Sequence, residues 1–280
     1  RQLHDDLAGL ADASYRDGQH VVAPGLGLTH GVRLPDQAAI RRGLAKATKG
    51  DRASTLLFVA DRLLREPELE AQWIGMALLE RTVLTEPERS WQLLRRAAAR
   101  AADWITVDTL AHPVGTGILH QPHRWEELEQ LTISPSRWER RLVGSAIATI
   151  PFVDHRLGRS PAVARTALPI LALLIGDAEP DVQKSLSWAY RSMTIVDPAA
   201  TTEALAAEAE TAAAASDGNR AWVIRDALPK LAPADATAIR TRLDGIRRKP
   251  HAQSTSKAAE LAARFAVMGL GRDMPEPPLT

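Results

Sequence analysis

Apolar residues recur three and four positions apart along most of this 280-residue chain, which is the spacing of one face of an α-helix. Alternation of apolar and polar residues, the pattern of a half-buried strand, is rare. Ala, Leu, Arg and Glu dominate and favour helix, while Pro, Gly, Asp and Ser interrupt the helical stretches. We therefore predict an all-α protein.

The predicted helices cover residues 1–15, 35–47, 52–65, 68–82, 87–102, 104–119, 124–131, 137–150, 162–174, 182–195, 198–215, 220–231, 233–247 and 254–268. Residues 16–30 contain Gly and Pro and are expected to form a loop, and residues 269–280 a frayed tail. Helix pairs recur about every 35 to 45 residues without an exact common motif. We expect one domain over residues 1–280, a HEAT-like α-solenoid with a concave face. An irregular helical bundle is the alternative.

Composition excludes several classes of protein. The chain has no cysteine, so it has no disulfide framework and no thiolate metal site. No run of about 18 apolar residues indicates a membrane span, and the charged first residues do not resemble a signal peptide. His120 and His123 flank a proline and lack a third nearby ligand, so we expect no metal site. We expect a cytosolic protein.

Charge is distributed unevenly near the C-terminal end, although the net charge is only +1. Residues 199–217 carry four acidic residues and no basic one. Residues 219–257 carry nine basic residues and three acidic ones. Such a basic stretch suits contact with phosphates. A solvated helix face is the alternative interpretation.

Three predicted helices each combine a tryptophan with a charged residue about one turn later. The pairs are Trp104 with Asp108, Trp138 with Arg141, and Trp188 with Arg191. Residues three or four apart share a helix face, so each indole lies beside its charged partner. Burying an unpaired charge is costly, which favours the edge of a cleft over the core. We therefore expect the three segments to line one site; packing of these indoles in the core is the alternative.

These segments, in this order, resemble the AlkD-like DNA alkylation repair family. Gly31-Val32-Arg33-Leu34-Pro35 is similar to an N-terminal element of that family, and the resemblance runs from about Gly31 to Lys230. It implies HEAT-like repeats whose concave face holds duplex DNA, and a glycosylase that removes N3- and N7-alkylated purines without a metal or cofactor. It also implies a monomer, with double-stranded DNA containing alkylated purines as the partner. We expect a cytoplasmic location, nucleoid-associated when bound to DNA.

The resemblance also implies roles for individual residues. Asp108 corresponds to the catalytic carboxylate, and Trp104 and Trp188 to the aromatic walls beside the lesion. Arg141, Arg191, Arg33 and Lys184 correspond to residues that contact DNA or hold the geometry of the site. Two features depart from the family pattern. The spacer between Arg141 and Trp188 is longer, and the tryptophan pair of the family is here Asp103-Trp104.

A single carboxylate is chemically sufficient for this reaction. Alkylation at N3 or N7 makes the purine cationic, so the base leaves as a neutral molecule and needs no general acid. Ordinary glycoside hydrolysis needs two carboxyl groups. Asp108 can stabilise the cationic sugar or orient water, and each indole adds cation–π attraction of about 0.5–2 kcal/mol. A DNA-binding protein without catalysis and a protein–protein scaffold are the alternative functions.

Overall fold

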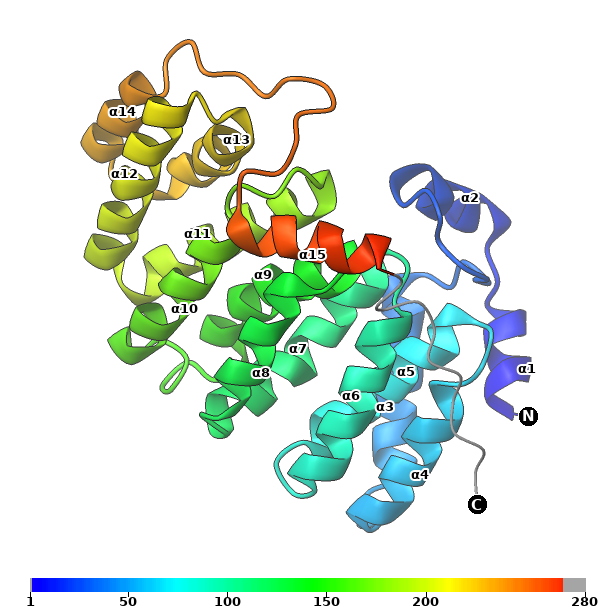
Figure 1. The fold of residues 1–280 in the computed structure, drawn as a ribbon. Coiled ribbons are helices and arrows are strands. Elements are labelled where there is room, and N and C mark those ends of the chain that lie inside the picture. Colours follow the sequence, from blue (N-terminus) through cyan, green and yellow to red (C-terminus); the bar gives the residue numbers. More distant parts are fainter. Residues whose placement is uncertain (1, 269–280) are drawn as a thin grey trace. The chain divides into compact units, whose positions relative to one another are not determined.

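The computed structural model describes residues 2–268, and every regular element in that range is a helix (Figure 1). The all-α prediction is therefore confirmed. The chain divides into two compact units, Arg1–Gln121 and Pro122–Thr280. The prediction of a single domain stays a prediction, and the expected tail at 269–280 lies outside the described residues.

Unit 1 is built from two rows of paired helices. Its helices are α1 (Gln2–Gly9), α2 (Ala13–Val22), α3 (Leu34–Ala47), α4 (Ala53–Leu63), α5 (Leu69–Thr82), α6 (Pro87–Arg100) and α7 (Trp104–His120). α4 packs on α5 and α6 packs on α7, which are the pairs expected from the sequence. Across the pairs, α5 packs on α7 and α4 on α6. Two such rows are the arrangement of a stacked helical repeat.

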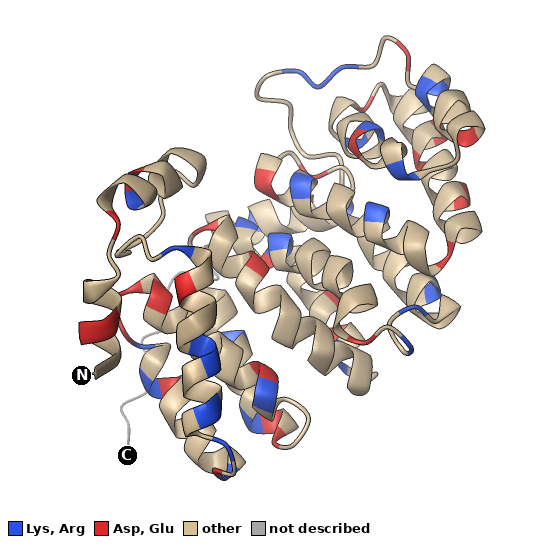
Figure 2. Cartoon of the chain, turned by 180° about the vertical axis from the view of Figure 1, so that it is seen from behind, with Lys and Arg blue, Asp and Glu red and all other residues tan. Residues whose placement is uncertain are grey.

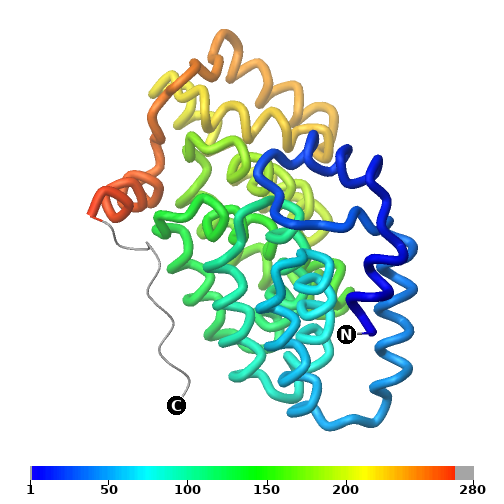
Figure 3. The backbone as a smooth tube through the Cα atoms, turned by 90° about the vertical axis from the view of Figure 1, so that its right-hand side faces the viewer, coloured from blue at the N-terminus to red at the C-terminus, as the bar shows by residue number. Residues whose placement is uncertain are grey.

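Unit 2 continues the same scheme. Its elements are α8 (Arg124–Gln130), the 3₁₀ turn η1 (Leu131–Ile133), α9 (Arg137–Val153), α10 (Pro161–Leu174), α11 (Pro180–Val196), α12 (Pro198–Ala215), α13 (Gly218–Ala227), η2 (Leu228–Lys230), α14 (Pro233–Arg242) and α15 (Lys257–Val267). α9, α11 and α13 form one row, and α10, α12 and α14 form the other. Figure 3 follows the backbone from α14 along an irregular segment to α15.

The interface between α9 and α11 is the most extensive helix contact in unit 2. It depends on Gly144 of α9, because a Cβ there would lie 2.7 Å from the carbonyl carbon of Ser185 and 2.9 Å from the nitrogen of Leu186. The two backbones can approach this closely only where a side chain is missing. One turn earlier, the buried Arg140 donates from Nε to Asp177 Oδ2 at 2.8 Å, which adds a charged link from α9 to the turn before α11.

The N-terminal region differs from the prediction of one helix followed by a loop. α1 ends at Gly9, and a second helix, α2, occupies residues 13–22. Asp12 starts α2 because its backbone is extended and its side chain accepts a hydrogen bond from the Tyr15 nitrogen at 2.9 Å. The sequence of α2 is polar and contains glycine, so its apolar spacing gave no helix signal.

A fully buried carboxylate, Glu70 on α5, organises the chain that returns from α2 to α3. Glu70 Oε1 accepts from the backbone nitrogens of Gly31 at 2.9 Å and Val32 at 3.2 Å. It also accepts from the Thr29 hydroxyl, while Oε2 accepts from the His30 nitrogen at 3.2 Å. Gly31 has a φ of +75°, and a Cβ there would collide with the backbone of α2. Gly31 and Val32, which begin the Gly-Val element noted in the sequence, are therefore where α5 fixes the positions of α2 and α3.

Glu70→Leu is expected to lower the free energy of unfolding by at least about 2 kcal/mol, because buried backbone N–H groups lose their acceptor. Glu70→Gln keeps one acceptor oxygen and should lose less. Urea denaturation measures both changes, and amide exchange at Gly31 should speed up in parallel. Exposed Glu80 on the same helix is the control, with Glu80→Gln expected within about 0.5 kcal/mol of the parent. Equal loss in the Glu70 and Glu80 variants would contradict this role.

Gly144→Ala is expected to destabilise unit 2 by about 1–3 kcal/mol, because the added methyl group has no space against the α11 backbone. Gly43, which is exposed in the middle of α3, is the matched control. A Cβ at Gly43 meets no atom within 4 Å, so Gly43→Ala should stabilise its helix by about 0.5–1 kcal/mol. Shifts of the urea midpoint in the same direction for both variants would show that the close approach is not the cause.

Candidate functional site

The start of α7 holds the first predicted site residues, and Asp103 fixes its geometry. Asp103 Oδ1 accepts from the Thr106 nitrogen at 2.8 Å, and Oδ2 accepts from the Thr106 hydroxyl at 2.7 Å. The Thr106 hydroxyl in turn accepts from Trp73 Nε1 on α5 at 3.0 Å. Burial raises the pKa of the Asp103 carboxyl, although its bonds to Thr106 act in the opposite direction. The residue that departs from the family pattern is thus the N-cap of the helix that carries the site.

Trp104 is half-buried and lines a hollow of about 600 Å³ within unit 1. Its indole nitrogen donates to the carbonyl oxygen of Val22, at the end of α2, at 3.1 Å. The hollow is bounded by α2, α3, α5 and α7, with aromatic side chains from Tyr15, Trp73 and Trp104 and two arginines, Arg33 and Arg41. The sequence did not single out Tyr15, because it lay at the end of a helix that was predicted with the wrong bounds.

Asp108 lies one helical turn after Trp104, so the two side chains share a face of α7 as predicted. It is half-buried, and the next residue, Thr109, lines the hollow. Burial is the main cause of the raised pKa of the Asp103 carboxyl, and hydrogen bonds to it act in the opposite direction. The negative charge of Asp108 makes a smaller contribution that also raises this pKa. This start of α7 therefore carries two carboxylates, one capping the helix and one beside the indole.

Arg33 is the residue before α3, and its guanidinium is already paired inside unit 1. Nε and Nη2 donate to Asp12 Oδ2 at 2.9 Å and 2.7 Å, and the group lies 5.6 Å from the centre of the Tyr15 ring. The backbone N–H of Tyr15, and then Arg33, hold the pKa of the Asp12 carboxyl below its ordinary value. Arg33 thus joins α2 to α3 at the rim of the hollow, and its contact with DNA stays a prediction.

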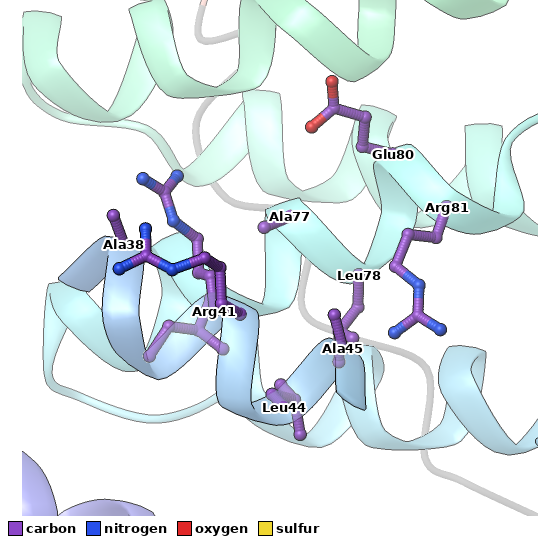
Figure 4. Close-up of a pocket in the computed structure, with 10 residues that line it drawn as sticks. Ala38, Arg41, Leu44, Ala45, Ala77, Leu78, Glu80 and Arg81 are labelled. Carbon is purple, nitrogen blue, oxygen red and sulfur yellow. The ribbon is translucent and has the colours of Figure 1, made fainter. Parts of the chain in front are cut away.

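A second hollow on unit 1, of about 370 Å³, lies between α3 and α5. Figure 4 shows two small side chains, Ala45 and Ala77, between Arg41 and Arg81. Arg41 and Arg42 come from α3, and Arg81 comes from α5, where it donates to the Thr48 hydroxyl at 2.7 Å. None of these arginines belongs to a tryptophan segment, so no pattern in the sequence selected them.

In unit 2, three predicted residues fall on one face of α11: Lys184, Trp188 and Arg191. Lys184 is exposed and forms no ion pair within residues 2–268, whereas Trp188 is half-buried. Arg191 Nη1 donates to the carbonyl oxygen of Asp226 on α13 at 2.9 Å and pairs with its carboxylate. We call these three residues the α11 row.

Arg141 has a different setting from the α11 row, because it is buried. Its Nη1 donates to the carbonyl oxygen of Asp181 at 2.7 Å, and the Asp181 carboxylate lies 3.9 Å away. Arg141 therefore fastens α9 to the first turn of α11. This contact suits a residue that holds the site in shape, and direct contact with DNA stays a prediction.

The three tryptophan segments are thus distributed over both units. Trp104 and Asp108 belong to unit 1, whereas the segments around Arg141 and Arg191 belong to α9 and α11, which pack together in unit 2. That all three line one site stays a prediction.

One group of side chains in unit 1 has the composition of a cation site. In the described part of the chain, His4, Glu66 and Glu68 are a group whose ligand atoms lie within 4.8 Å of one another, as a cation site would require. His4 Nε2 is 3.6 Å from the Glu66 carboxylate, and its Nδ1 is 3.8 Å from that of Glu68. A histidine held between two carboxylates also accounts for this group. Between residues 2 and 268, no helix combines the length and apolar character needed to cross a bilayer.

Comparison with known proteins adds an independent finding. A search of curated proteins found no match. The model of one family, described as DNA alkylation repair enzyme, matches residues 6–231. This range includes α2 to α13, and with them Asp108, Trp104 and the α11 row. The chain therefore belongs to the DNA alkylation repair enzyme family.

Proposed function

We propose that this protein is a monofunctional DNA glycosylase that hydrolyses the N-glycosidic bond of cationic N3- and N7-alkylated purines in duplex DNA. The observation that carries the proposal is the pair formed by Trp104 and Asp108. A half-buried carboxylate and a half-buried indole share one face of α7, and the indole lines a hollow together with other aromatic side chains. The proposed location of the protein is the cytoplasm, with association to the nucleoid through DNA.

The proposed chemistry follows from the charge of the substrate. An alkylated purine already carries a positive charge, so its bond to the sugar breaks with the electron pair moving to the base. Positive charge then develops on the sugar. Asp108 stabilises this charge, orients the attacking water and accepts its proton as the water oxygen forms the new bond to the anomeric carbon. The indole face of Trp104 adds cation–π attraction of about 0.5–2 kcal/mol.

Two features support the geometry needed for this role. The Asp103 cap and its bonds to Thr106 fix the first turn of α7, from which both side chains project. The bond from Trp104 to the Val22 carbonyl fixes the rotation of the indole. Catalytic groups are effective only when their positions are held by neighbouring contacts.

The α11 row supports the proposed contact with DNA. Lys184 offers an exposed positive charge, and Arg191 is held in place by Asp226 with part of its side chain accessible. Lysine and arginine bind backbone phosphates, arginine with a planar donor pair. Trp188, which lies between them on the same face, is proposed to contact the sugar and base.

Asp108→Asn tests the catalytic assignment. Release of 7-methylguanine and 3-methyladenine from methylated duplex should fall by about 100-fold or more, because the amide cannot stabilise the cationic sugar. Affinity for the duplex should be retained. Asp51, exposed in the turn between α3 and α4, is the matched control, and Asp51→Asn should release base at the parent rate. Full excision by Asp108→Asn would remove this residue from the reaction.

Neutral lesions test the mechanism without any substitution. Uracil in DNA should not be released, because a neutral base needs a general acid or another source of leaving-group stabilisation. The measurement is base release from matched duplexes that carry either uracil or 7-methylguanine at the same position. Efficient release of uracil would contradict the proposed route. Duplex binding without release of either base would instead support a DNA-binding protein of this family that lacks catalysis.

A further inference from the structure

Residues 232–268 lie beyond the range of the family match and belong to unit 2. They comprise α14, an irregular segment at residues 243–256, and α15. We call residues 243–256 the strap. The sequence predicted helix as far as residue 247, but α14 ends at Arg242, and Gly245 has a φ of +75°, which helical backbone does not allow.

The strap is fastened to unit 2 near both of its ends. Thr255 donates from its backbone nitrogen to the Gly176 carbonyl at 2.8 Å, and Ser254 donates from its hydroxyl to the same oxygen at 3.0 Å. Asn219, which is buried on α13, donates from Nδ2 to the Gln253 carbonyl at 2.9 Å. These bonds hold the end of the strap that leads into α15.

The other end of the strap is fastened by Arg225 of α13, whose Nη2 donates to the Leu243 carbonyl oxygen. The middle of the strap is fastened through Arg248. Its Nη1 donates to Gln183 Oε1 at 2.6 Å, and its guanidinium lies 5.5 Å from the centre of the Trp222 ring. Gly218, at the start of α13, makes this approach possible, because a Cβ there would lie 2.6 Å from the Cα of Arg248. The strap therefore has a defined position on α11 and α13, unlike a free loop.

The strap carries three basic residues, Arg247, Arg248 and Lys249, and one acidic residue, Asp244. From Gly245 to Lys257 the chain contains four Lys or Arg residues and no Asp or Glu. Figure 2 shows the consecutive basic stretch as a blue section of the segment between α14 and α15. Arg247, Arg248 and Lys249 are all exposed, and Arg247 and Lys249 form no ion pair with any residue between 2 and 268. Their charge is therefore not neutralised within the described protein.

The position of the strap relates this charge to the α11 row. Arg248 contacts Gln183, and the next residue along α11 is Lys184, the first member of that row. The strap is thus bonded to the first turn of α11, at the residue that precedes the α11 row.

We propose that Arg247 and Lys249 of the strap bind backbone phosphates of duplex DNA and extend the contact made by the α11 row. This inference rests on the proposed DNA-binding function. Phosphodiesters fit better than an acidic protein surface, because the charges lie on a fixed segment that is bonded to α11, the helix that carries Lys184 and Arg191 on one face. Arg248 acts differently: its bond to Gln183 and its stacking on Trp222 position the strap. The family match ends before the strap, so this contact is an addition to the shared fold.

The test is equilibrium binding to an undamaged duplex at several salt concentrations, measured by fluorescence anisotropy. Each phosphate contact contributes about 0.9 to the slope of log K against log salt. The double variant Arg247→Gln/Lys249→Gln should bind more weakly, with a slope smaller by about 1.8. The matched control is Arg156→Gln/Arg165→Gln. It removes two exposed charges from α10 and the turn before it, in the other helix row of unit 2, and should keep the parent slope.

Both variants should keep the parent thermal midpoint, because none of the four side chains forms an ion pair in the described protein. An unchanged slope in the strap variant, or an equal fall in the control, would overturn the proposal. A parent protein whose affinity for the duplex does not depend on salt would overturn it as well. Because the probe is undamaged DNA and no base is released, failure of the glycosylase assignment leaves this result interpretable. Conversely, an unchanged slope in the strap variant together with normal base release by the parent protein would overturn only this inference.

Discussion

The carboxylate of Glu70 is the constraint on which the N-terminal half of the candidate site depends. A buried carboxylate is tolerated only when its oxygens accept several hydrogen bonds. Glu70 meets this condition by gathering the backbone of residues 29–32, which forces the chain through the left-handed conformation at Gly31. The same turn fixes the connection from α2 to the start of α3. Both helices line the hollow beside Trp104, so the shape of the hollow depends on Glu70 of α5.

Close approach of backbone plays the corresponding role in unit 2. Gly144 lets α9 lie directly against α11, and Gly218 lets the strap lie against α13. At both glycines the close approach of the backbones brings an arginine within hydrogen-bonding distance of α11. Arg141 then reaches the first turn of α11, and Arg248 reaches Gln183 in the same turn. The first turn of α11 therefore accepts hydrogen bonds from both arginines, Arg141 of α9 and Arg248 of the strap.

Periodicity predicted the paired helices well, because their apolar spacing and their Pro or Asp breaks are local signals. It failed for α2, whose start depends on the Asp12 cap and whose position depends on contacts with residues distant in sequence. The end of α14 at Arg242 was also missed, since the following basic residues favour helix and the positive φ of Gly245 is not visible from helix propensity.

For the site, the one-turn spacing of Trp104 and Asp108 could be read directly. The pairing of Arg33 with Asp12 and the burial of Arg141 could not, because both result from tertiary contacts.

The bond from the Trp104 indole to the Val22 carbonyl has a spectroscopic consequence. It joins a residue of the candidate site to the last turn of a helix more than 80 positions earlier in the chain. The indole N–H resonance of Trp104 in an NMR spectrum therefore reports whether α2 is docked. It can be told apart from that of Trp73, whose N–H is bonded to the hydroxyl of Thr106 and does not depend on α2. The Trp104 indole N–H thus reports whether α2 stays packed against α7 at the hollow.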